Sequence, residues 1–62
     1  MEFRVVVNMD NVAFDDENEL PRIVEKIARQ LREGGVIVGH APIIDINGNR
    51  VGEWTIELKE AQ

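Results

Sequence analysis

Apolar residues recur every three or four positions in the middle of the chain and predict one amphipathic helix. They form a single stripe at the 3.6-residue helical period: Leu20, Ile23, Val24, Ile27, Ala28 and Leu31. Charged residues fill the other side, where Glu25 precedes Arg29 by four residues, a spacing that stabilises helices. Gly34 and Gly35 follow the stripe, and a glycine in the left-handed conformation commonly ends a helix.

Two residues compete as the start of this helix. Asp16 and Glu19 have the spacing of a capping box. That start would place Pro21 beyond the first turn, where its ring and its missing N–H are costly. Asn18 as N-cap places Pro21 within the first turn, whose N–H groups lack partners in the helix in any case. We therefore expect the helix to begin after Asn18.

Segments with period-two alternation predict the first and last strands of a sheet. In residues 3–7, one face holds Phe3, Val5 and Val7, and the other holds Arg4 and Val6. In residues 53–58, apolar Trp54, Ile56 and Leu58 alternate with Glu53, Thr55 and Glu57. The last strand therefore has one buried and one wet face, as in an antiparallel sheet that is covered on one side.

A middle strand is expected between Val36 and Asp45, where apolar residues flank Pro42. Proline cannot donate to a sheet ladder, so Pro42 marks an edge, a bulge or a break. Asn47-Gly48 lies between this segment and the last strand, and an Asn-Gly pair is typical of a tight hairpin turn. The middle and last strands are therefore predicted to pair as a hairpin.

Together these elements predict one α+β domain, residues 1–62, of β-α-β-β order. A right-handed crossover through the helix places the first strand parallel to the middle strand and one strand away. The last strand is then central, and the strand order is 2-3-1 in an antiparallel or mixed sheet. We expect the core to combine the helix stripe with Phe3, Val5, Val7, Trp54, Ile56, Leu58 and Ile43 or Ile44. The opposite sheet face, with Arg4, Val6, Thr55 and Val51, is left uncovered.

The net charge of −5 comes from one acidic stretch that contains no lysine or arginine. Its members are Asp10, Asp15, Asp16, Glu17 and Glu19, and the remaining acidic and basic residues balance. One interpretation is structural, because carboxylates stabilise the positive end of a helix dipole. The other is functional: these residues form a partner-binding surface for a basic groove of another protein.

A basic helix face is the alternative binding surface. Arg22, Lys26, Arg29 and Arg32 lie along one side of the predicted helix and could meet a nucleic-acid backbone. Glu25 and Glu33 are interleaved with them, and an acidic chain has little nonspecific affinity for phosphates. We therefore do not expect nucleic acid as the main partner.

Few residues of the chain could take part in catalysis or bind a metal. The chain has no Ser, Cys or Tyr, so a nucleophile with its base and orienting group cannot be assembled. His40, or a carboxylate pair among Asp10, Asp15 and Asp16, is the remaining route to acid–base chemistry. Asp45-Ile46-Asn47-Gly48-Asn49 begins like a calcium loop, but Ile56 stands where the bidentate Glu is required, so turn chemistry explains it better. We expect no enzyme, no cofactor and no metal.

Localisation and assembly are expected as follows. No apolar run approaches the roughly 20 residues of a membrane helix, and the first residues lack the pattern of a secretory signal, which favours the cytoplasm. A core this small favours a homodimer through the open sheet face. The alternative is that the first strand pairs edge to edge with a second copy across a twofold axis.

Three segments carry a resemblance to other proteins: residues 6–14, Glu19-Leu20, and above all residues 45–54, DINGNRVGEW. In these the chain resembles a group of small proteins of unknown function, often encoded by phages, plasmids and related mobile elements of bacteria. The resemblance implies an accessory protein, such as a phage-type modulator of a host protein. It assigns no catalytic residues.

Overall fold

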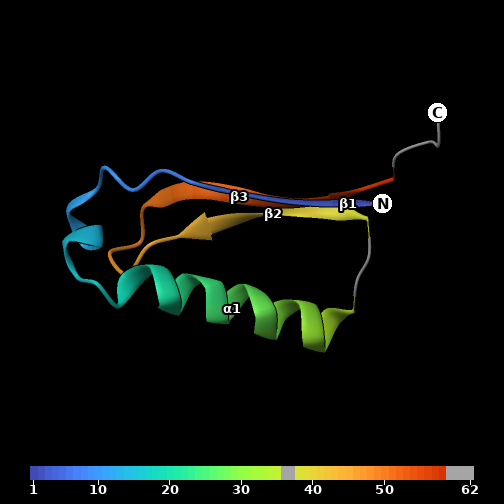
Figure 1. The fold of residues 1–62 in the computed structure, drawn as a ribbon, viewed down its shortest axis with the longest axis horizontal. Coiled ribbons are helices and arrows are strands. Elements are labelled where there is room, and N and C mark those ends of the chain that lie inside the picture. The colour runs from blue at the N-terminus through green and yellow to red at the C-terminus, as the bar shows by residue number, and fades with distance from the viewer. Residues whose placement is uncertain (36–37, 59–62) are drawn as a thin grey trace.

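The chain folds into one helix packed on a three-stranded sheet. The computed structural model describes residues 1–35 and 38–58. Its elements are β1 (Glu2–Val7), the 3-10 turn η1 (Val12–Asp15), α1 (Glu19–Gly34), β2 (Gly39–Ile44) and β3 (Arg50–Glu57) (Figure 1). Val36 and Ile37, which were expected in the middle strand, lie outside the described residues.

The strand order is β1-β3-β2, which confirms the predicted order with the last strand in the centre. Both β1 and β2 pair antiparallel with β3, so β1 and β2 run parallel to each other on opposite edges. The helix lies along one face of the sheet and leaves the other face bare (Figure 1).

The helix begins and ends where the sequence predicts. Asn18 is the N-cap, and its carbonyl oxygen accepts the first helical bond from the N–H of Arg22 at 3.0 Å. Its side chain makes no capping bond; instead the Asp16 carboxylate accepts the N–H of Asn18 at 2.8 Å. Gly35 follows the last helical residue with φ = 76°, a conformation that glycine adopts without strain.

The core is smaller than the apolar pattern predicts. Its buried centre is Ile23, Ile27, Ile43 and Val51, with Val7, Phe14, Leu31 and Trp54 packed around it. The helix is therefore centred over β2 and β3 rather than over all three strands. Val24 and Ala28 of the helix stripe and Leu58 after β3 are exposed, and Phe3 and Val5 of β1 are only half covered. These five residues were wrongly assigned to the core.

A bulge near the start of β3 corrects the predicted position of Val51. Ile43 pairs with Gly52 and the next residue, Ile44, pairs with Arg50, so Val51 is the extra residue. The bulge turns the Val51 side chain into the core, where it is 8% exposed, rather than onto the open face. At Gly52 a Cβ would overlap the carbonyl oxygen of Val6, so this close approach of β1 and β3 requires glycine.

Candidate protein-binding surfaces

The acidic segment is held in place by a short ordered turn. The side chain of Asn11 accepts the N–H of Ala13 at 2.9 Å, and its carbonyl accepts the N–H of Phe14 at 3.0 Å. Ala13 is buried and Phe14 packs against the core. These contacts fasten η1 to the body of the molecule, so the charged residues around it have a defined position.

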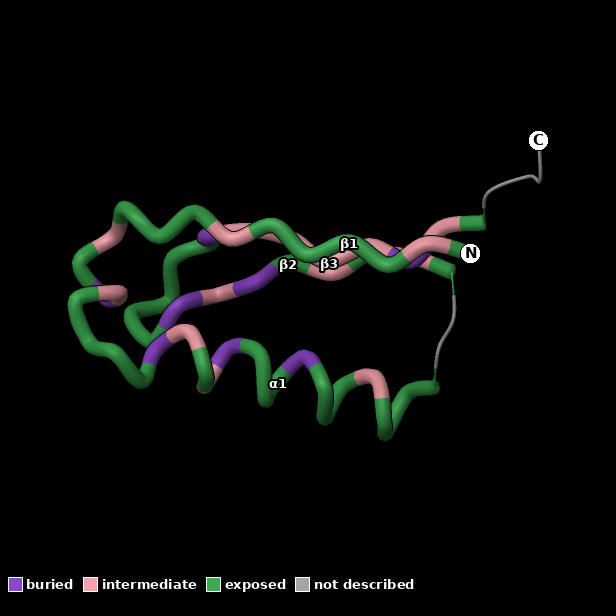
Figure 2. The backbone as a smooth tube through the Cα atoms, viewed as in Figure 1, coloured by how far each residue is buried: buried purple, intermediate pink, exposed green. Residues whose placement is uncertain are grey.

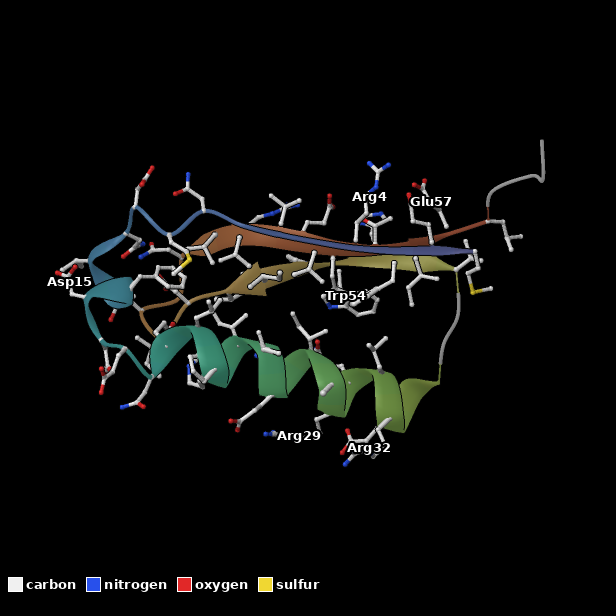
Figure 3. All side chains as sticks on the ribbon, viewed as in Figure 1. Arg4, Asp15, Arg29, Arg32, Trp54 and Glu57 are labelled. Carbon is white, nitrogen blue, oxygen red and sulfur yellow. The ribbon has the colours of Figure 1, made fainter. Side chains whose placement is uncertain are left out.

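Four carboxylates of this segment face solvent at one end of the molecule: Asp10, Asp15, Asp16 and Glu17. We call these four residues the acidic end; Figure 3 labels Asp15 within it. The ion pairs of the described residues involve other carboxylates: Glu2, Glu19 and Glu53. Among the described residues, no ion pair therefore neutralises the negative charge of the acidic end.

Glu19 differs from the other acidic residues because it is buried, with 4% of its surface exposed. The Arg22 side chain donates to both of its carboxylate oxygens, at 2.8 and 2.9 Å. The backbone N–H of Ile46 donates to Oε2 at 2.8 Å. The bond from Arg22, with help from Ile46, holds the pKa of Glu19 below its ordinary value although burial opposes this.

Glu19 is thus a structural residue that ties the helix start to the β2–β3 loop, and it is not part of the exposed surface proposed from the sequence. Arg22 also reaches the carbonyl oxygen of Ile44 at 3.4 Å. The spacing of three residues between Glu19 and Arg22 indicates their pairing in a helix. Nothing local predicts the bond to Ile46, which lies far along the chain.

The β2–β3 loop is organised by a second buried carboxylate, Asp45, which is 4% exposed. Its Oδ1 accepts the backbone N–H groups of Asn47 and Asn49, at 2.9 and 2.8 Å. Gly48 has φ = 89°, which glycine adopts readily. The backbone N–H groups of the loop therefore bind the Asp45 side chain, which forms the turn. This agrees with the interpretation of the segment as a turn.

The basic helix face is only partly available. Arg22 is engaged by Glu19. Lys26, Arg29 and Arg32 are exposed, and Figure 3 shows Arg29 and Arg32 on the side of α1 that points away from the sheet. The exposed acidic residues of the same helix, Glu25 and Glu33, lie among them and lower the positive potential of this face.

The open sheet face is mainly polar. The strand register places these side chains on it: Glu2, Arg4 and Val6 from β1, Glu53, Thr55 and Glu57 from β3, and His40 and Pro42 from β2. Arg4 and Glu57 project away from the helix (Figure 3). His40 Nδ1 and Arg50 Nη2 both approach Glu53 Oε2, at 3.2 and 3.4 Å. With so many charged groups, this face gives little support to the expected dry sheet-on-sheet dimer.

Comparisons with family models, with curated proteins and with solved structures found no match to this chain. Within residues 1–35 and 38–58, no helix has the length and apolar character needed to cross a membrane. Across the same residues, no three His, Cys, Asp or Glu side chains are grouped so that they could hold a metal ion. The surfaces of the fold are therefore the features from which a function can be inferred.

Proposed function

We propose that this chain is a small non-enzymatic binding protein that recognises another protein through its acidic end. The observation that carries the proposal is the exposure of Asp10, Asp15, Asp16 and Glu17 on a turn fastened to the core. Their charge is not neutralised by an ion pair within the described part of the chain, so it remains available to a partner. Such a fixed cluster speeds the approach of a basic surface and favours it over an acidic one.

The surroundings of the acidic end extend the contact. An open hollow beside it on the sheet is lined in part by Asn8, Asp10, Asn11, Arg50 and Glu53. A partner that docks on the carboxylates would meet hydrogen-bond donors and acceptors there. The resemblance to small proteins of mobile elements supports one concrete version, a phage-type modulator that acts on a protein of its bacterial host.

The test is affinity capture from a bacterial lysate with two charge-matched variants. The first carries Asp10→Asn, Asp15→Asn and Glu17→Gln, and leaves the Asp16 turn intact. The control carries Glu25→Gln, Glu33→Gln and Glu57→Gln, which removes the same charge from other surfaces. We expect the control to retain the proteins that the unmodified chain captures and the first variant to lose them. Equal recovery by both variants would remove the acidic end from the function.

Nucleic-acid binding through the basic helix face has less support, since Arg22 is already paired with Glu19. Lys26, Arg29 and Arg32 remain, with Glu25 and Glu33 beside them. Titration of mixed RNA and DNA at low salt separates the two functions. Binding that is lost when Lys26, Arg29 and Arg32 are changed to Gln would replace the protein-binding proposal.

A further inference from the structure

The two edges of the sheet are protected to different degrees. On β2, Pro42 removes a backbone donor, a register shift lies at Ile43/Ile44, and the Lys26 flank of the helix lies alongside. On β1, by contrast, the pairing with β3 is regular from end to end and the strand contains no proline. Free strand edges without such features are the ones that accept another strand.

The backbone groups that β1 offers at this edge follow from its pairing. The N–H of Asn8 donates to the carbonyl oxygen of Val51 in β3 at 2.7 Å. Because successive residues of a strand direct their backbone groups to opposite sides, Arg4 and Val6 also face β3. The N–H and C=O groups of Phe3, Val5 and Val7 therefore point toward the free edge.

The side chains of β1 are also incompletely covered, as the exposed tube of this strand in Figure 2 shows. On the face toward the helix, Phe3 is 49% and Val5 40% exposed. Phe3 contacts Trp54 with ring centroids 6.1 Å apart, so it forms the outer margin of the core. Val24, on the flank of α1 opposite Lys26, is exposed as well. An unpaired edge is thus combined with apolar surface beside it.

We propose that a second copy of this chain pairs with β1, antiparallel across a twofold axis perpendicular to the sheet. The two sheets then become one continuous sheet with both helices on the same face. Val5 lies opposite the partner's Val5, and Phe3 lies opposite the partner's Val7. Each of these pairs can exchange both of its backbone hydrogen bonds, because Phe3, Val5 and Val7 carry the free groups.

The charge of Arg4 and the length of β1 select this register. A twofold axis perpendicular to the sheet keeps each side chain on its own face, so residues of the same parity must pair. Centring the pairing on Arg4 would place two arginines directly opposite each other, which is unfavourable. Centring it on Phe3 would leave Val7 unpaired, and centring it on Val6 would leave Phe3 without a partner in the strand. Centring it on Val5 places Arg4 opposite the partner's Val6 and satisfies every free group of the strand.

The charge of the whole molecule also fits this arrangement. The acidic end follows β1, whereas the chain start lies at the other end of the strand (Figure 1). Antiparallel pairing therefore sends the two acidic ends to opposite ends of the joined sheet, so two chains of net charge −5 do not bring these clusters together. This interface uses the edge of β1 rather than the acidic end, and it does not depend on the proposed function.

Sedimentation equilibrium on two substitutions of one exposed residue, Val6→Lys and Val6→Glu, tests both the dimer and its register. For the unmodified chain we expect the mean mass to rise from 7.0 kDa toward twice that value with concentration. Position 6 of one copy faces the partner's Arg4, so Glu should tighten the dimer relative to Lys. We expect dissociation constants that differ on the order of tenfold.

Fold stability provides the control, because Val6 lies opposite Glu53 in its own sheet. Lys there should stabilise the monomer and Glu should destabilise it, which is the reverse of the order expected for the dimer. If the dimer were lost because the variants fold poorly, Val6→Glu would lose more dimer than Val6→Lys. That order is the reverse of the one expected from the interface. Equal dissociation constants for the two variants would overturn the proposal. So would a mean mass of the unmodified chain that stays at 7.0 kDa up to about 1 mM, a concentration well above those at which small specific interfaces form.

Amide hydrogen exchange distinguishes this edge from any other interface. The N–H groups of Phe3, Val5 and Val7 should gain protection as protein concentration rises. Those of Arg4 and Val6, already bonded to β3, should be protected at every concentration. Self-association without a concentration-dependent gain at Phe3, Val5 and Val7 would place the interface elsewhere and overturn the proposal.

Discussion

Ile23 and Val24 are neighbours on the apolar stripe of the helix, yet the structure places them in opposite environments. Ile23 is 2% exposed and lies at the centre of the core, whereas Val24 is 53% exposed. Substituting each by Ala compares a core position with the open flank on the β1 side. The pair tests whether the helix is centred over β2 and β3.

The magnitudes follow from burial. Ile23→Ala leaves a cavity in a packed core and should cost about 2–5 kcal/mol of unfolding free energy. A chain of this length is stabilised by about 3–9 kcal/mol in total, so this variant should be close to unfolded. Val24→Ala loses only part of its burial and gains up to about 0.7 kcal/mol of helix propensity, so the net change should be under about 1 kcal/mol.

Urea unfolding followed by circular dichroism measures both values. The measurement should be made at low micromolar protein concentration, so that self-association through β1 does not cover Val24. We expect a large decrease of the midpoint for Ile23→Ala and almost none for Val24→Ala. Similar losses for the two variants would show that the helix stripe is buried symmetrically, which would contradict the offset of the helix and the open flank beside β1.

Three further predictions concern single contacts. Because the pKa of Glu19 is lowered, the contribution of its carboxylate to stability is complete above the ordinary pKa near 4.5 and is lost as pH falls through the lowered value. Glu19→Gln should therefore flatten the pH dependence of the urea midpoint in that range. An unchanged pH profile would contradict this. Gly52→Ala should disrupt the fold, whereas Gly34→Ala, where the Cβ meets nothing, should be neutral or stabilise by up to about 1 kcal/mol. Thermal melts that rank the two variants in reverse would refute the close approach of β1 and β3 at Gly52. Asn11→Ala should cost about 1 kcal/mol in the same assay, and no loss would mean that its bond to the N–H of Ala13 does not hold the turn.

Most of the fold was predictable because its main signals are local. The apolar stripe, Gly35 and the Asn47-Gly48 turn each fix one element, and the handedness of the crossover then leaves one strand order. The sheet register beyond these elements was not predictable. A single extra residue at the bulge moved Val51 from the open face into the core, and alternation along β3 gives no sign of it.

The candidate site was predicted in part for the same reason. Asp10, Asp15, Asp16 and Glu17 are exposed, as expected of charged residues in a loop. Glu19 belongs to the same acidic stretch of the sequence but lies in a different environment. Its third hydrogen bond comes from the backbone N–H of Ile46 in the β2–β3 loop. A contact between residues so far apart in sequence depends on the packing of the helix against the hairpin, which composition does not encode.

We propose that the acidic end binds another protein by charge. The most direct test is the association rate of a captured partner, measured at increasing salt with the unmodified chain and with the Asp10→Asn, Asp15→Asn, Glu17→Gln variant. Because salt screens exposed charges, the rate for the unmodified chain should fall steeply with ionic strength, and the variant should associate slowly with a much shallower dependence. Equal rates and equal salt dependence for the two proteins would contradict the account.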